Sequence, residues 1–205
     1  MPRIAESRPP AEPSSPGQRA RHLRILRAAA HFGAEKGLER VQMHEVAKAA
    51  GVAIGTLYRY FPSKTHLFTA VMAEQIDRLS ASAPGVASDT APEDAVADLL
   101  VHAGRQLLVT PALASAMLQS ANAANAAMVT DAGRIDTMFH SLLLRTLELD
   151  DPTAHDITLV RLLVQCWYGV LQSSLNGRIS MPDAENDIRV ACRLLLVPRS
   201  NAPQG

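Results

Sequence analysis

The sequence predicts an all-α protein, on three observations. Apolar residues make up 47% of the 205 residues and aromatic residues only 4%, with abundant alanine and leucine, a balance that suits helices packed through aliphatic side chains. Apolar residues recur at spacings of three and four along most of the chain, without strand-like alternation of useful length. Several of these segments begin with proline beside acidic residues, which is typical of helix N-termini. We therefore expect about nine helices.

The N-terminal third predicts a tail and four helices. Four prolines by Pro13 and a Ser-Ser-Pro-Gly run predict a disordered tail over residues 1–17. The helical repeat then starts at Gln18 and ends at Gly37. Two short helices follow, and Ser63 caps a longer fourth helix. The expected helices are 18–37, 43–50, 54–60 and 64–82.

The remaining two thirds predict five helices after a loop over residues 83–91. Four of them begin at a proline, because the amide that proline lacks has no partner in the first turn of a helix. These prolines are Pro92, Pro111, Pro152 and Pro182. The expected helices are 92–109, 111–120, 122–149 (with a break near 131–133), 152–177 and 181–197.

Residues 46–64 have the spacing of a helix-turn-helix. Ala47 keeps the first helix thin where two helices cross, Gly51 permits a tight turn, and Leu57 points back into a small core. Such a unit places its second helix in the major groove of DNA. Residues 1–64 contain eleven Lys and Arg against five Asp and Glu, whereas the rest contains nine against fifteen. The net charge of zero therefore conceals a basic front.

The run Gly-Thr-Leu-Tyr-Arg-Tyr-Phe-Pro-Ser-Lys over residues 55–64 closely resembles the segment that identifies bacterial TetR-family regulators. Together with Val-Gln-Met-His-Glu-Val-Ala over residues 41–47, the head looks like regulators of the KstR type, which act in sterol and lipid catabolism. The resemblance is close over residues 20 to about 75 and rests on helix number beyond them. It implies a DNA-binding head over 18–64, a ligand-binding and dimerisation domain over 65–198 and a disordered tail over 199–205.

The resemblance implies DNA contacts that the side-chain chemistry supports. Thr56 suits a phosphate or a thymine methyl, and Gly55 permits close backbone approach. Tyr58 and Tyr60 offer hydroxyls to phosphate, although one of them packing in the head's core is the alternative. Lys64 combines its charge with a helix N-terminus. The expected DNA-binding set is Arg24, Gln42, Ala53, Ile54, Gly55, Thr56, Tyr58, Arg59, Tyr60 and Lys64.

Two of these assignments leave alternatives. Gln42 stands where many relatives carry Thr or Ser, and Gln is a poorer helix cap, although it can still donate to phosphate. Arg24 belongs to a basic series with Arg19, Arg21 and Arg27. That series is either a solvated face of the first helix or an arm that contacts the DNA backbone or minor groove.

The helix expected over 152–177 is apolar on nearly every side, which indicates burial against its own core and against a partner chain. The helix over 181–197 shows apolar residues at matching spacing. The family dimerises through its last two helices, so we expect a homodimer through these segments that binds a palindromic double-stranded DNA operator. The alternative is that both faces pack only within one chain.

The middle of the chain is rich in small and flexible side chains, which suits a cavity for a small apolar effector. The family uses this region for effector binding, and the resemblance to KstR-type regulators implies an effector of steroid or fatty-acyl type. Ordinary core packing is the alternative for each residue. A coenzyme A group would need basic residues, for which Arg105 and Arg134 are the candidates. The expected ligand-binding set is Met117, Leu118, Asn122, Asn125, Met128, Met138, Phe139, Leu142 and Trp167.

Other function classes find little support. No metal-ligand spacing, nucleophile elbow, phosphate loop or dinucleotide fingerprint occurs, so we expect no metal, no cofactor and no enzyme. Cys166 and Cys192 are expected to be buried thiols. Without a secretory signal or membrane span, the expected location is the cytoplasm.

Three rivals to a ligand-released repressor stay open. The first is a ligand-independent regulator or an activator, which would follow if the middle region packs solidly. The second is a helical lipid-binding or scaffold protein with a vestigial head. The third, an all-α enzyme, lacks a catalytic constellation.

Overall fold

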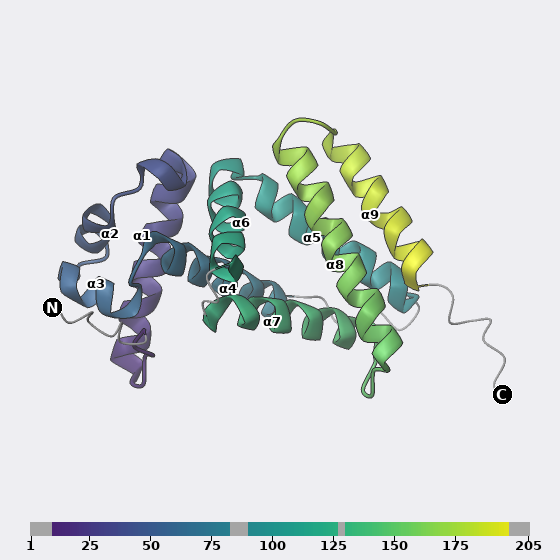
Figure 1. Cartoon of the computed structure of the whole chain (residues 1–205), viewed down its shortest axis with the longest axis horizontal. Coiled ribbons are helices and arrows are strands. Elements are labelled where there is room, and N and C mark those ends of the chain that lie inside the picture. The colour runs from purple at the N-terminus through teal and green to yellow at the C-terminus, as the bar shows by residue number, and fades with distance from the viewer. Residues whose placement is uncertain (1–9, 83–89, 127–129, 197–205) are drawn as a thin grey trace, which may run out of the picture. The chain divides into compact units, whose positions relative to one another are not determined.

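The computed structural model describes residues 10–82, 90–126 and 130–196. Within these residues the chain forms nine helices and no strand, which confirms the all-α prediction (Figure 1). The chain divides into two compact units. Unit 1 comprises residues 1–74 and 112–132, and unit 2 comprises residues 75–111 and 133–205.

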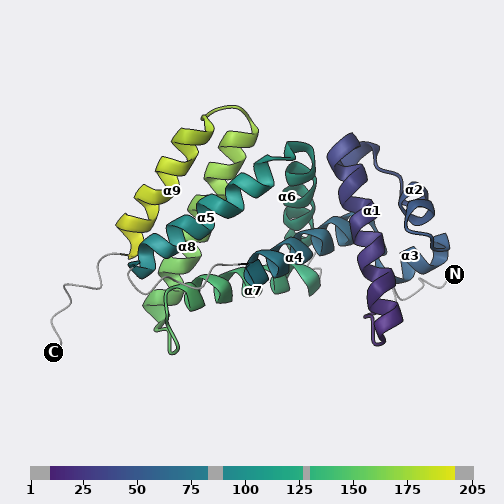
Figure 2. The same ribbon diagram turned by 180° about the vertical axis from the view of Figure 1, so that it is seen from behind.

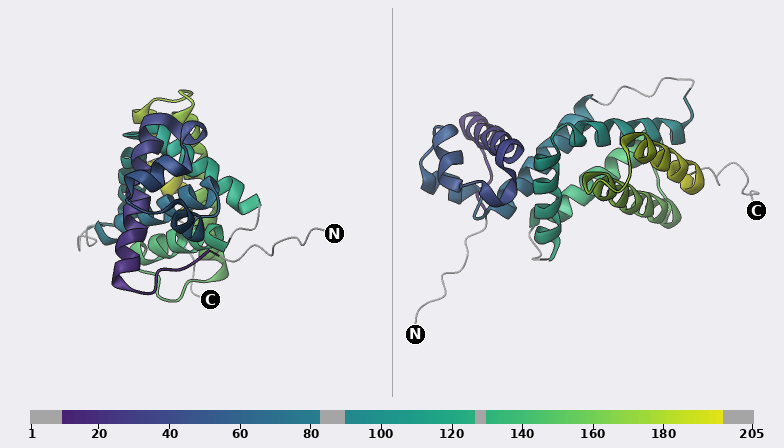
Figure 3. Two further views of the ribbon diagram at one scale, coloured as in Figure 1. Left: turned by 90° about the vertical axis from the view of Figure 1, so that its left-hand side faces the viewer. Right: turned by 90° about the horizontal axis from the view of Figure 1, so that it is seen from above.

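Unit 1 contains α1 (Pro16–Arg40), α2 (Met43–Ala49) and α3 (Ile54–Tyr60), with the first part of α4 (Lys64–Ser82) and most of α6 (Pro111–Ala126). Figure 3 shows α1, α2 and α3 gathered into one cluster, and α2 contacts both of its neighbours. The first three helices and α4 share an apolar core, because each contributes fully buried side chains. This core includes Ile25, Val46, Leu57, Leu67 and Phe68.

α1 begins two residues earlier than expected because Ser15 caps it. The Ser15 hydroxyl accepts a hydrogen bond from the Gln18 amide (3.2 Å), and Pro16 follows in the first turn. Pro16 and Gly17 are therefore helical, so the disordered tail expected over 1–17 is wrong at its C-terminal end. At the other end, Gly37 has φ 72° inside the segment that extends to Arg40, which places the break in the helix where the sequence predicted it.

Unit 2 contains α5 (Pro92–Leu108), most of α7 (Thr130–Thr146), α8 (Ala154–Leu175) and α9 (Met181–Leu196). α9 packs against both α5 and α8, and Figure 2 shows α5 and α9 side by side from behind. The core between these three helices is aliphatic, and its side chains are at most 3% exposed. It includes Val96, Leu100, Val160, Leu163, Leu171 and Ile188.

Several predicted boundaries are wrong. The break expected near 131–133 does not occur, because α7 is helical from Thr130 to Thr146. The chain does not break between residues 120 and 122, because α6 continues to Ala126 through an alanine-rich stretch that favours helix. The proline rule fails at α8, which begins at Ala154 rather than at Pro152. There the Thr153 hydroxyl accepts from the Asp156 amide (3.2 Å) and the Asp156 carboxylate accepts from the Thr153 amide (2.9 Å), so a capping box sets the start.

Candidate nucleic-acid interface and effector region

The turn between α2 and α3 has the hydrogen bonding of a Schellman motif, in which a residue with positive φ ends an α-helix. Gly51 has φ 63°, a conformation in which a side chain would be strained. The Val52 amide donates to the Ala47 carbonyl (3.0 Å) and the Gly51 amide to the Lys48 carbonyl (3.1 Å), which closes α2 and redirects the chain. Ala47 and Leu57 are 3% and 0% exposed. The residues that predicted a helix-turn-helix therefore occupy the positions that this motif requires.

One face of α3 is uncovered. Ile54 is 42% and Tyr58 47% exposed, and these residues lie one helical turn apart. Ala53, Gly55 and Arg59 are also exposed, and Thr56 is half-buried. A Cβ atom added to Gly55 would meet nothing within 4 Å, so nothing in unit 1 requires glycine there. The face is open to a partner along its length.

Tyr60 is not part of that face. It is 3% exposed, and its ring lies 5.7 Å from that of His22 in an edge-to-face arrangement. Its hydroxyl is buried without a hydrogen-bond partner. The interpretation of Tyr60 as an exposed phosphate contact is therefore wrong, and the alternative of core packing applies to it. Leu57 and Phe61 are core residues, as predicted.

Two cations expected at DNA donate hydrogen bonds to backbone carbonyls within unit 1. Lys64 Nζ donates to the carbonyls of Glu39 (2.9 Å) and Leu38 (3.3 Å) in the last turn of α1. Arg24 Nε donates to the Ala50 carbonyl (3.2 Å) at the end of α2. Each side chain thus joins two segments of unit 1. Both side chains have further N–H groups that these bonds leave available. Among the described residues, neither forms an ion pair with a carboxylate.

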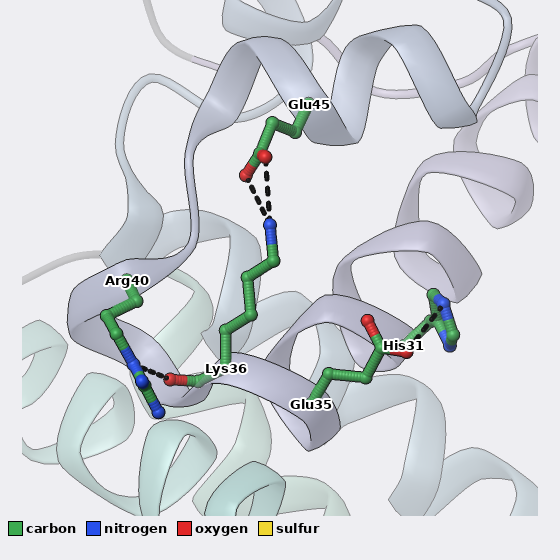
Figure 4. A network of polar contacts seen from close by, with 5 residues as sticks. All are labelled: His31, Glu35, Lys36, Arg40 and Glu45. Carbon is green, nitrogen blue, oxygen red and sulfur yellow. Dashed lines mark hydrogen bonds and ion pairs between the residues drawn. The ribbon is translucent and has the colours of Figure 1, made fainter.

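Gln42 is exposed and makes no side-chain cap on α2. A contact that the sequence did not reveal stabilises this helix instead. Lys36 Nζ of α1 lies 2.8 and 3.0 Å from the two carboxylate oxygens of Glu45 in α2, as Figure 4 shows. The hydrogen bond from Lys36 lowers the pKa of Glu45 below its ordinary value. Nine residues separate the two, so no helical periodicity indicated the pair.

The expected effector residues of unit 1 lie mostly in its core. Met117 and Leu118 are 2% and 0% exposed, whereas Asn122 is exposed. The Asn125 side chain and Met128 lie outside the described residues.

The expected effector residues of unit 2 form an aromatic and aliphatic cluster. Phe139, Leu142 and Trp167 are each at most 6% exposed, and Met138 is half-buried. The ring centroids of Phe139 and Trp167 lie 5.0 Å apart, and Trp167 Nε1 donates to the Leu100 carbonyl (3.0 Å).

His140, next to this cluster in sequence, was missed by sequence reasoning. Its Nδ1 lies 2.6 Å from the Asp136 carbonyl oxygen, which can only accept, so Nδ1 carries the proton. In the neutral ring Nε2 is then an acceptor, and it is buried without a partner. Only the folded geometry could reveal this atom, because an isolated histidine in a helical pattern carries no such information.

The arginine expected near a coenzyme A group is already paired. Arg105 of α5 makes two hydrogen bonds to the carboxylate of Glu185 in α9 (2.6 and 2.5 Å), which raise the pKa of the guanidinium and lower that of the carboxyl. Arg189 and Asp98 pair at 2.7 Å between the same two helices. Arg134 is exposed. Of the two arginines, Arg134 is thus the better placed to bind an anionic group.

α8 and α9 carry large exposed apolar side chains: Ile157 is 50%, Leu162 47% and Leu194 72% exposed. Cys166, four residues after Leu162, is exposed too, so the prediction of two buried cysteines is wrong for it. Cys192 is buried, and burial raises the pKa of its thiol to about 12.

The described residues contain neither a group suited to a metal ion nor a candidate membrane span. No group of three or more His, Cys, Asp or Glu there could hold a metal ion. No helix in those segments has the length and apolar character needed to cross a membrane.

Models of known protein families match both the N-terminal and the C-terminal part of the chain. Residues 25–71 match the model for "Bacterial regulatory proteins, tetR family", and residues 90–195 match "Tetracyclin repressor-like, C-terminal domain". The "HTH-type transcriptional repressor KstR" of Rhodococcus jostii is 30% identical over 93% of this chain and 90% of its own length. The repressor of the same name from Mycobacterium tuberculosis is 30% identical over 97% of this chain and 89% of its own.

A solved structure is more similar. The chain described as a TetR transcriptional regulator from Rhodococcus sp. RHA1 is 59% identical, with a TM-score of 0.84 over 89% of this chain and 98% of that one.

Proposed function

The chain belongs to the TetR family of bacterial transcriptional regulators, and on that premise we propose that it is a homodimeric repressor. It binds a palindromic DNA operator in the cytoplasm and is released from it by a small apolar effector. The observation that carries the proposal is the uncovered face of α3. Ile54 and Tyr58 are exposed one turn apart beside Arg59, on the helix that such motifs insert into the major groove.

The side chains on this face suit direct contact with DNA. Tyr58 offers a hydroxyl to phosphate, Arg59 offers a fork of donors to a phosphate or a guanine edge, and Ile54 can contact a thymine methyl. The Arg59 guanidinium lies 5.4 Å from the Tyr60 ring centroid, which limits its orientations without neutralising it. One such helix reads few base pairs, so specificity requires two heads on a palindrome.

A second copy of the chain is the partner that we propose for α8 and α9. Leu162 and Cys166 lie on one face of α8 at a spacing of four, and Leu194 is an exposed leucine on α9. Exposed apolar side chains on two adjacent helices indicate an interface. The similarity to KstR repressors and the match to the C-terminal family model support a family-like arrangement.

The effector contacts the Phe139, Leu142 and Trp167 cluster of unit 2 in this proposal. These apolar side chains favour an apolar body, and the unpartnered Nε2 of His140 would accept a hydrogen bond from a ligand that reaches it. A steroid or fatty-acyl compound with a hydroxyl group has this chemistry. Because Trp167 is the chain's single tryptophan, its fluorescence reports occupancy directly.

Fluorescence anisotropy on DNA from the upstream region of the protein's own gene tests the proposal. We expect saturation at two chains per site, a steep loss of affinity with salt, and dissociation when a sterol or fatty-acyl pool that quenches Trp167 is added. Binding without any ligand effect would favour the ligand-independent regulator or an activator. No binding to any DNA, even at low salt, would contradict the proposal and favour the scaffold.

A further inference from the structure

Residues 10–15, here called the N-terminal strap, join α3 to the start of α1. The Ala11 amide donates a 2.9 Å hydrogen bond to the carbonyl of Arg59 in the last turn of α3. At the other end of the strap, Ser15 caps α1, and the Ser14 amide and hydroxyl lie 2.8 and 3.0 Å from the Gln18 side-chain oxygen. The strap is therefore fixed at both of its ends.

The composition of the strap makes it stiff. Pro10 and Pro13 flank the bonded amide of Ala11, and each proline fixes its own φ and restricts the residue before it. A stiff segment loses little conformational entropy when its single bond forms. The bond therefore holds the end of α3 at a smaller entropic cost than a flexible tail would require.

α3 needs such a tie because it is short. It has seven residues, and Ala53 at its N-terminus makes no side-chain cap. Two-turn helices are marginal without tertiary contacts, and the last carbonyls of a helix have no partner within it. The Arg59 carbonyl is one of these, and the strap satisfies it. The His22 ring of α1 packs 4.9 Å from that of Phe61 just beyond, so α1 and the strap both hold this end.

We propose that the N-terminal strap is a positioning element for DNA recognition. By holding the Arg59 carbonyl it fixes the C-terminal turn of α3, and with it the directions of the Tyr58 and Arg59 side chains. The proposal rests on the proposed function, since it assigns the strap a role in operator binding. The strap itself needs no contact with DNA for this role.

The first test changes the bonded amide in the full-length chain. Ala11→Pro removes the N–H group, and the matched control Ala11→Ser keeps it. We expect Ala11→Pro to weaken operator binding about 3- to 10-fold, in line with the loss of one hydrogen bond, while binding to unrelated DNA stays the same. Ala11→Ser should bind as wild type. Equal operator affinity for the two variants would overturn the proposal.

The second test separates the effect of the strap's hydrogen bond from the effect of its charge. Deletion of residues 1–9 keeps the Ala11 bond, whereas deletion of residues 1–12 removes it together with the negative charge of Glu12. Electrostatics alone predicts tighter DNA binding for the longer deletion, and the strap predicts weaker operator binding, measured at a temperature where both deletion variants are folded. Equal or tighter binding would contradict the strap.

The same titrations distinguish the two proposals. If the wild-type chain and the variants prefer operator DNA equally, only the proposed role of the strap is excluded. If the wild-type chain does not prefer operator DNA over unrelated DNA, the proposed function is contradicted. The role of the strap in recognition is then contradicted as well.

Discussion

The helix-turn-helix region and the α5–α8–α9 region are held together by different means. α2 and α3 have seven residues each. Two side chains of α1 tie α2 in place, because Arg24 bonds the Ala50 carbonyl and Lys36 bonds the Glu45 carboxylate. Lys64, at the start of α4, bonds the last turn of α1. α5, α8 and α9 are two to three times longer and bury a continuous aliphatic core. The first region therefore combines an apolar core with polar ties to its short helices, whereas the second packs long helices around its core.

Charge is used differently as well. Two arginines in unit 2, Arg105 and Arg189, are paired with carboxylates across α5 and α9. In the head, Arg24 and Lys64 bond only to carbonyl oxygens, which orients them without cancelling their charge. A carbonyl tie fixes the position of a cation and leaves its field available to phosphate. The same two side chains therefore stabilise the head and keep it basic.

The largest effect should come from the buried core of unit 2. Trp167→Ala removes an aromatic ring that is 6% exposed and its bond to Leu100, so we expect the free energy of unfolding to fall by about 3–5 kcal/mol. Urea denaturation measures it. Val109→Ala, at a side chain 74% exposed, is the matched control and should change little. A loss below about 1 kcal/mol for Trp167→Ala would mean that this core tolerates a large cavity.

Adding one methyl group probes the packing of each unit. A Cβ on Gly33 would lie 2.6 Å from Phe68 Cε1 and 2.9 Å from Leu113 Cδ1, so Gly33→Ala should lower the free energy of unfolding by about 1–3 kcal/mol. A Cβ on Gly104 would meet Leu171 Cδ2 at 3.5 Å, an ordinary contact. Gly104→Ala should therefore gain up to about 1 kcal/mol from helix propensity. Thermal unfolding of both variants measures these changes. Equal shifts in melting temperature for Gly33→Ala and Gly104→Ala would contradict the predicted difference.

The two tyrosines of α3 should respond in opposite ways. Tyr60→Phe removes a buried hydroxyl without a partner, and we expect the free energy of unfolding to rise by about 1 kcal/mol with operator affinity unchanged. Tyr58→Ala should leave stability nearly unchanged and weaken operator binding about 10-fold. Parallel denaturation and anisotropy titrations measure both quantities. Loss of DNA binding in Tyr60→Phe would show that the Tyr60 hydroxyl contributes to DNA binding.

The smallest effect concerns the pH dependence of the Lys36–Glu45 tie. Because folding lowers the pKa of Glu45 from 4.5, its stabilising contribution is fully present above pH 4.5 and is lost as pH falls through the lower folded value. Glu45→Gln should therefore lose slightly more stability at pH 7 than below pH 4. Chemical denaturation at several pH values measures the difference, and a constant difference across this range would exclude the linkage.

Local sequence predicted the helices and the turn well, because periodicity, prolines and Gly51 act over a few residues. The same information failed where contacts cross the chain. It could not show that Tyr60 turns inward while Tyr58 does not, since both lie in one seven-residue helix, or that Lys36 would reach Glu45. The uses of Lys64 and Arg105 were missed because each bonds a group 25 or more residues away.

Operator binding by Gly55→Ala tests directly whether α3 lies against DNA. A Cβ at this position meets nothing within the protein, so the substitution should leave the melting temperature unchanged or raise it. If the α3 face is open because DNA covers it, the added methyl group obstructs the groove, and anisotropy should show operator affinity reduced about 10-fold. Unchanged affinity on the same operator would contradict the placement of α3 against DNA.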